Sequence, residues 1–173
     1  MKSFRGPFPY CPFCRTVMGP QEEYGRERPT CSECGYIQYL NPAPAAAVII
    51  RRGEKICLVQ RKYPPRQGMW TLPAGFMEYD ETIQQTAIRE AAEETNLTVA
   101  ITELFAVYTG RLPPDLPVVL TVFRAEEQTG DLHAGDDAAA AGFFDLDHLP
   151  GEIAFGSHRK VLAALREEAA DRE

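Results

Sequence analysis

The chain has 173 residues, of which 45% are hydrophobic, and its formal net charge at pH 7 is −7. This length suffices for one well-buried domain with a small appendage, and no apolar run is long enough for a membrane-spanning helix. The acidic balance argues against nucleic acid or an anionic membrane as the main partner. Because the first residues contain no apolar stretch typical of a secretory signal, we expect a cytoplasmic protein.

Four of the five cysteines form two CxxC pairs, namely Cys11, Cys14, Cys31 and Cys34. Two such turns supply four thiolates, which complete a closed tetrahedral Zn²⁺ site, and Gly35 gives the second turn backbone freedom. Disulfides or free thiols are the alternatives, and a redox-active CxxC would leave the second pair unexplained. So short a segment buries too little core to fold alone, so the metal is expected to supply folding energy. We predict a structural zinc ribbon over residues 1–40 and a second domain over residues 41–173.

The second domain alternates between strand and helix patterns. A β-hairpin is predicted around the turn at Gly53-Glu54, and Cys57 in its second strand is expected to be a core residue. A helix is predicted to begin after Asp80 as its N-cap, with Ala87, Ile88, Ala91 and Ala92 on the flank that faces a sheet. Strand patterns cover residues 45–52, 55–62, 70–72, 97–110, 117–127 and 141–146, and an amphipathic helix is predicted over residues 157–168. This order predicts an α/β fold with a mixed sheet between helices.

The predicted helix that follows Gly75 carries three carboxylates within an arc of about 100°, those of Glu90, Glu93 and Glu94. Like charges at i,i+4 repel by a few tenths of a kcal/mol, so an isolated helix gains nothing from this pattern. A solvated helix face is the simple alternative. A divalent cation would reverse the balance, because Mg²⁺ is held by carboxylates, waters and substrate phosphates. The segment therefore indicates a metal site for phosphate chemistry.

The surrounding segment resembles the Nudix box, G-x5-E-x7-R-E-U-x-E-E-x-G-U, where U is apolar. The matching residues are Gly75, Glu81, Arg89, Glu90, Ala91, Glu93, Glu94 and Leu97. Asn96 replaces the second glycine at the helix end, where left-handed geometry is expected and Asn is the next most tolerant residue. The sequence WTLPAG upstream is also similar to the family. The resemblance implies a Nudix α/β/α sandwich with a mixed β-sheet, preceded by the small zinc ribbon.

The resemblance also implies metal-dependent hydrolysis of a pyrophosphate. Its expected Mg²⁺ or Mn²⁺ ligands are Glu90, Glu93, Glu94 and the carbonyl of Gly75. Such a reaction needs charge neutralisation on the phosphoryl oxygens and a positioned water. Arg89 is expected to orient the glutamates through an i,i+4 pair with Glu93. Glu81 either stabilises the helix N-terminus or contributes to catalysis.

The general base is the least determined part of the predicted mechanism. Glu90 is the first choice, followed by Asp136 and Asp137 in the loop before the last predicted strand. Glu126 and Glu127 are weaker candidates, and any acid outside the box is alternatively a solvated loop residue. His133, His148 and His158 show no metal-ligand spacing, so they are expected to be structural or exposed, with a substrate pocket as an alternative for His158.

A four-cysteine ribbon before a Nudix box resembles two groups of enzymes. NADH pyrophosphatases carry an SQPWPFPxS signature after the box, which is missing here. A compact group resembling FAD and ADP-ribose pyrophosphatases shares the NP linker, WTLPAG and a late segment like LPGEIAFGSH. The implied reaction splits a nucleoside diphosphate linked to another moiety, a small-molecule substrate, and releases AMP with FMN or ribose 5-phosphate. NADH or (d)NTP hydrolysis, a nucleotide sensor, a zinc-ribbon binding module and a homodimer are left open.

Overall fold

The computed structural model describes residues 8–135 and 137–171. The chain forms two compact units, one ending at Pro42 and including Pro114–Leu116, the other comprising Ala43–Pro113 and the chain from Pro117 onward. The elements are, in chain order, β1 (Gly19–Glu23), β2 (Arg26–Thr30), β3 (Ala43–Arg52), β4 (Lys55–Arg61), β5 (Trp70–Thr71), β6 (Ala74–Phe76), α1 (Ile83–Thr95), β7 (Thr98–Leu112), β8 (Leu116–Thr129), β9 (Ala138–Asp145) and α2 (Gly156–Ala170).

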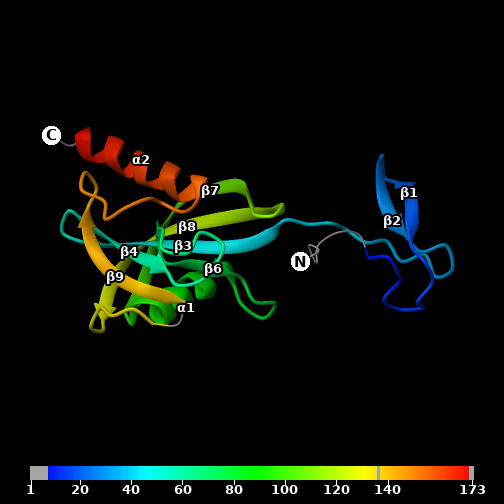
Figure 1. Cartoon of the computed structure of the whole chain (residues 1–173), viewed down its shortest axis with the longest axis horizontal. Helices are drawn as coiled ribbons and strands as arrows, with labels where there is room; N and C mark the ends of the chain where they lie inside the picture. Colours follow the sequence, from blue (N-terminus) through cyan, green and yellow to red (C-terminus); the bar gives the residue numbers. More distant parts are fainter. Residues whose placement is uncertain (1–7, 136, 172–173) are drawn as a thin grey trace. The chain divides into compact units, whose positions relative to one another are not determined.

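The N-terminal unit is built on one antiparallel pair of strands, β1 and β2 (Figure 1). Gly19 lies opposite Thr30, and the chain reverses through Tyr24 and Gly25, both of which have positive φ. The buried residues of its core are Cys11, Met18 and Cys31, with Tyr36 packed against them. So small an apolar core leaves the four cysteines as the main source of cohesion.

The C-terminal unit is built on a seven-stranded sheet in the order β5-β4-β3-β8-β7, with β6 paired to β3 and β9 paired to β4. The pairing of β3 with β8 is parallel, whereas β3 pairs with β4 and β6 in antiparallel fashion. Helices α1 and α2 cover opposite sides of this sheet (Figure 1). The predicted mixed sheet between helices is therefore confirmed. Within the described part of the chain, no helix is long and apolar enough to span a membrane.

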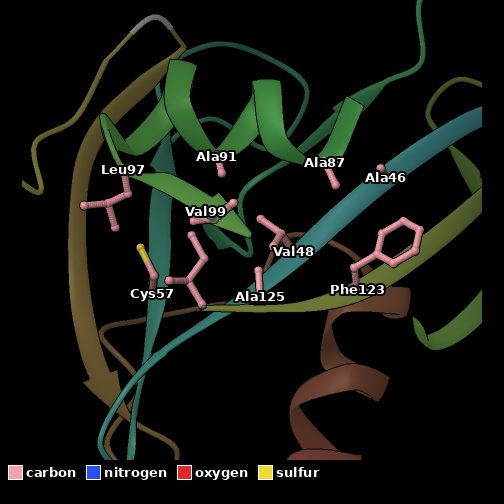
Figure 2. Close-up of a cluster of buried hydrophobic side chains, with 10 residues drawn as sticks. Ala46, Val48, Cys57, Ala87, Ala91, Leu97, Val99, Phe123 and Ala125 are labelled. Atoms are coloured by element: carbon pink, nitrogen blue, oxygen red, sulfur yellow. The ribbon is translucent and has the colours of Figure 1, made fainter. Parts of the chain in front are cut away.

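Helix α1 packs on the sheet through small side chains. Ala87 and Ala91 are fully buried and point toward Val48 and Val99 of the strands (Figure 2). Small residues at these positions let the helix approach the strands closely, as the sequence predicted. Ala92 was expected on the same flank, but it is exposed, because a step of 100° from Ala91 carries it off the buried face.

The start of α1 differs from the prediction, and its end agrees with it. Thr82, not Asp80, is the N-cap: its hydroxyl accepts from Gln85 N–H, and the Gln85 side chain accepts from the Thr82 N–H. This reciprocal capping box satisfies two otherwise unpaired donors, which Asp80 two residues earlier could not do. At the other end Asn96 has φ of 60°, the predicted left-handed conformation.

Helix α2 covers the other face of the sheet with Val161, Leu162 and Leu165, all buried. The segment before α2 is tied to β5, because the Trp70 N–H donates to the Glu152 carbonyl and the Ala154 N–H donates to the Trp70 carbonyl. These two bonds fix β5 and the chain that follows it, which leads directly into the Nudix-like segment at Ala74 and Gly75.

Candidate active site

Gly75 and Glu90 meet at a position where a side chain on residue 75 would not fit. Gly75 lies in β6 opposite Ala46 of β3. A Cβ atom added to Gly75 would lie 1.9 Å from Oε1 of Glu90 and 2.5 Å from its Oε2. Gly75 is not among the positive-φ residues, so the sequence requires glycine here for close approach and not for an unusual backbone conformation. The Glu90 carboxylate fills the space beside the β6 backbone.

Arg89 is the centre of an ion-pair network. Its Nε lies 2.6 Å from Glu81, and its Nη1 lies 2.8 Å from both Glu90 and Glu93. Its Nη2 donates to the Phe76 carbonyl at 3.0 Å. The predicted i,i+4 pair with Glu93 is therefore present, together with two further carboxylates and one carbonyl. Every nitrogen of this guanidinium has a partner in the protein, among them the carboxylates of Glu81, Glu90 and Glu93.

Glu81 is part of this network and not of the helix terminus. It lies before the capping residue, and the first turn of α1 contains no acidic residue. The Arg89 hydrogen bond lowers the pKa of Glu81 to about 2, with help from the Thr86 hydroxyl and the Glu78 N–H. The carboxylate therefore stays ionised, and its contacts connect the loop after β6 to α1.

Glu94 is a buried carboxylate, with only 7% of the residue exposed. Its Oε2 accepts a hydrogen bond of 2.9 Å from the Ala74 N–H. Burial raises the pKa of Glu94 to about 8, against this hydrogen bond, and the charges of Glu90 and Asp137 raise it further. Burial also raises the pKa of Glu90. Carboxylates that are costly to ionise without a counter-charge suit a divalent cation, so this donor set fits Mg²⁺ or Mn²⁺.

The structure brings some of the predicted ligands together and holds others apart. Glu90 and Glu94 lie beside the neighbouring β6 residues Gly75 and Ala74, whereas the half-exposed Glu93 side chain forms an ion pair with Arg89. Over residues 8–135 and 137–171, only one group of three or more His, Cys, Asp or Glu side chains has its donor atoms within 4.8 Å of one another, and it is the four cysteines. Arg89 is the counter-ion of Glu90 and Glu93, whereas Glu94 accepts from the Ala74 N–H.

The loop between β8 and β9 lies against the last turn of α1 and brings Asp137 to the site. The Gly135 N–H donates to the Glu94 carbonyl, and a Cβ on Gly135 would lie 2.4 Å from the carbonyl oxygen of Glu93. The Asp137 side chain is exposed, and its charge raises the pKa of both Glu90 and Glu94. The alternative base Asp136 lies outside the described residues.

The other acidic candidates lie away from this cluster. Glu127 forms an ion pair of 2.7 Å with Arg52 at the β3–β4 hairpin. Arg52 is six residues along β3 from Ala46, the partner of Gly75, a distance of about 20 Å in a strand. Glu126 lines a small cavity of about 230 Å³ with Arg51 and Arg124. Neither Glu126 nor Glu127 is therefore part of the site formed by Gly75, Glu90 and Glu94.

His158 is a buried structural residue that supports the site. Its Nδ1 lies 2.8 Å from the Thr71 hydroxyl and accepts from the Leu72 N–H at 3.2 Å. Burial lowers the pKa of His158 to about 4, so the ring is neutral and accepts hydrogen bonds. His133 and His148 are exposed. The sequence pattern did not reveal the Thr71–His158 contact, because its members lie 87 residues apart.

The four cysteines of the N-terminal unit converge as their spacing predicts. The Sγ atom of Cys14 lies 3.4 Å from Cys31 Sγ and 3.7 Å from Cys34 Sγ, and Cys11 Sγ lies 3.5 Å from Cys34 Sγ. A tetrahedral site with Zn–S bonds of about 2.3 Å separates its sulfurs by about 3.8 Å. The hydrogen bond with the Thr16 hydroxyl, followed by the Thr16 backbone N–H and the Cys31 thiol, lowers the pKa of Cys14 to about 6. This donor set fits Zn²⁺.

The family follows from a comparison with known proteins. Residues 41–165 match the NUDIX domain. The chain belongs to the Nudix family. It is 41% identical over 128 residues to an ADP-ribose pyrophosphatase of Methanocaldococcus jannaschii, covering 73% of this chain and 75% of that protein. Together with the family, this similarity shows a Nudix hydrolase that acts on pyrophosphate bonds.

Two further similarities extend over more of this Nudix chain. It is 31% identical over 145 residues to the NAD-capped RNA hydrolase NudC of Chromobacterium violaceum, which covers 82% of the chain but only 52% of NudC. The Nudix chain thus spans about half the length of that relative. A crystal structure of a NUDIX hydrolase from Nitrosomonas europaea has a TM-score of 0.81 and 34% identity, and covers 93% of this chain and 92% of that one.

Proposed function

We propose that this Nudix hydrolase cleaves the pyrophosphate bond of a nucleoside diphosphate linked to another moiety, ADP-ribose or FAD, and releases AMP. The observation that carries the proposal is the pair of α1 carboxylates beside β6, the partly buried Glu90 at Gly75 and the buried Glu94 at Ala74. Burial raises the pKa of both, so that a divalent cation would stabilise their ionised forms. The choice of ADP-ribose is supported by the similarity to the ADP-ribose pyrophosphatase of Methanocaldococcus jannaschii, of which this chain covers 75%. FAD is kept beside it on the resemblance of the ribbon and flanking motifs.

In the proposed site Glu90, Glu93, Glu94 and the Gly75 carbonyl hold Mg²⁺ or Mn²⁺. The bound metal would neutralise charge on the phosphoryl oxygens and lower the pKa of a bound water. Arg89 holds Glu90 and Glu93 in place, and because its nitrogens are engaged within the protein, it does not contact substrate. The four cysteines hold a structural Zn²⁺, which supplies the cohesion that the small core of the N-terminal unit lacks.

Glu90 is the proposed general base. A base works best when its pKa lies near the working pH, and burial moves the pKa of Glu90 in that direction. Asp137 is the second choice, because its exposed side chain lies in the loop that packs on the end of α1. Glu81 is a poor base, since its pKa of about 2 leaves it with little affinity for a proton. Its proposed contribution is to position Arg89.

An NAD-type substrate is the second candidate. NAD-capped RNA hydrolases of Vibrio cholerae and Yersinia enterocolitica match 93% and 94% of this chain. Matches of this length include part of the cysteine-containing N-terminal unit. The missing SQPWPFPxS segment argues against this candidate, so ADP-ribose and FAD stay first.

A substrate panel tests the proposal. ADP-ribose, FAD, NADH, dinucleoside polyphosphates and oxidised dNTPs are each incubated with Mg²⁺ or Mn²⁺, and AMP release is measured. We expect kcat/KM for ADP-ribose or FAD to exceed that of the other substrates by about tenfold, which corresponds to about 1.4 kcal/mol. Higher turnover of NADH would favour the second candidate.

The matched variants are Glu94→Gln and Glu54→Gln. Both remove one carboxylate, but Glu54 lies exposed in the hairpin turn. We expect Glu94→Gln to abolish metal-dependent release of AMP with the fold intact, because Gln retains an acceptor for the Ala74 N–H. Glu54→Gln should behave as the wild type. Retained turnover in Glu94→Gln would show that Glu94 of α1 has no part in the mechanism.

A further inference from the structure

The end of β4 has an irregularity beside the active site. Along the β4–β9 ladder Gln60 pairs with Ala140, but Arg61 pairs with Ala138, so β9 contributes one extra residue at this point. Bulges of this kind bend a strand, turn its side chains in a new direction and are frequent next to active sites. Immediately beyond, the Lys62 N–H donates to the Asp137 carbonyl at 2.7 Å. The bulge therefore places Arg61 at the same end of the sheet as Asp137.

Two contacts fix the Arg61 side chain. Its Nε donates to the Pro65 carbonyl at 2.8 Å, and its guanidinium carbon lies 5.1 Å from the centre of the Phe155 ring, at the start of α2. Among the residues that the structure describes, none forms a hydrogen bond or ion pair with the Arg61 terminal nitrogens Nη1 and Nη2. Arg61 is thus a pre-positioned cation with two donor groups available, in contrast to Arg89.

The surroundings of Arg61 are those of the active site. Burial dominates the pKa of both Glu94 and His158, and the Arg61 charge lowers the pKa of each, so the guanidinium lies within electrostatic reach of both. His158 is neutral and offers Arg61 no counter-charge, and Glu94 already accepts from Ala74. A guanidinium presents a planar pair of donors that matches two oxygens of a phosphate. A diphosphate bound between α1 and the end of β4 would supply those oxygens.

We propose that Arg61 is a substrate-binding residue that contacts a phosphate of the nucleoside diphosphate substrate. The inference rests on the proposed function for the identity of the substrate. It gives the two cations of the site separate tasks: Arg89 organises the carboxylates, and Arg61 holds the phosphate. Lys62 and Arg66 add positive charge to the same loop and increase the local attraction for a polyanion.

The test compares Arg61→Met with Arg52→Met. Both variants remove a guanidinium that stacks on a phenylalanine, but Arg52 stacks on Phe143 and pairs with Glu127 at the hairpin. Hydrogen bonds to a charged group account for about a ten- to hundredfold change in affinity. We therefore expect Arg61→Met to raise the KM for ADP-ribose and the inhibition constant of AMP by about that factor. The Mg²⁺ concentration for half-maximal activity should stay within about twofold, and Arg52→Met should change none of these constants.

An unchanged KM for ADP-ribose in Arg61→Met would overturn the proposal, as would a change confined to the Mg²⁺ dependence. Arg61→Lys decides the matter if the Met variant unfolds: it keeps the charge but not the paired donors, so its KM should rise by a smaller factor. If the wild type hydrolyses no substrate of the panel, the proposed function fails separately. ADP binding measured by calorimetry then tests Arg61 directly, with equal affinity in wild type and Arg61→Met as the refuting result.

Discussion

The substitution Gly75→Ala tests whether the close approach of β6 and α1 positions the catalytic carboxylate. The new methyl group would lie 1.9 Å from Glu90 Oε1, whereas an ordinary contact needs at least 3.4 Å, so the carboxylate must move by about 1.5 Å. It can move by side-chain rotation, because the clash involves the end of a flexible side chain and not backbone. A displacement of about 1 Å at a reacting group costs about a hundredfold in rate. We expect kcat/KM to fall at least that far.

Stability and activity should separate in this variant. Gly75 has no positive φ, so alanine adds no backbone strain and the melting temperature should stay within about 3 °C of the wild type. Gly110→Ala is the control, because a Cβ at Gly110 meets nothing within 4 Å. Adding Glu90→Asp, which retracts the carboxylate by about one C–C bond of 1.5 Å, should change the rate less in Gly75→Ala than in wild type. Activity of Gly75→Ala within threefold of Gly110→Ala would refute the reasoning.

Three further predictions concern Glu94, His158 and Cys31. Because the native pKa of Glu94 is about 8, the Mg²⁺-free folded state binds more protons than the unfolded state between about pH 5 and 8, so stability should fall as pH rises through this window. Urea unfolding should show this slope flattened by Mg²⁺ or by Glu94→Gln. His158→Leu should lower the free energy of unfolding by about 1–3 kcal/mol, since two buried donors lose their acceptor, and His158→Asn should recover most of it; equal losses would contradict this role. Elemental analysis should find about one zinc per chain and none in Cys31→Ser, and a native protein purified without zinc would contradict the ribbon.

Local sequence patterns predicted the two CxxC turns and the buried face of α1, because residue spacing along the chain determines both. Each CxxC turn is closed by its own backbone bond, such as Gly35 N–H to the Cys31 carbonyl, so the spacing alone predicts that each turn presents two thiolates together. The face of α1 that carries Ala87 and Ala91 follows from helical periodicity alone. The N-cap was misplaced by two residues, since Asp80 and Thr82 are both good caps and only the return bond from Gln85 selects Thr82.

Long-range features of the site could not be predicted in this way. The register shift at Ala139 arises from the pairing of β4 with β9, and no sequence pattern in either strand predicts it. The bond from Ala74 to Glu94 comes from a backbone N–H, a donor that every non-proline residue carries. The hydrogen bond between His158 and Thr71 forms because the fold packs the start of α2 against β5. Each of these contacts joins segments that only the folded sheet brings together.

The irregular residue of the Nudix box links two parts of the site. Asn96 adopts the left-handed conformation that glycine would adopt, but its Nδ2 also donates to the Asp131 carbonyl at 3.0 Å. A glycine has no side chain to make that bond, so in this chain the end of the glutamate helix is fastened to the loop that leads to Asp137. The Asn96 side-chain amide can therefore serve as a spectroscopic reporter: its proton resonances and their exchange with solvent would show whether this contact persists during turnover.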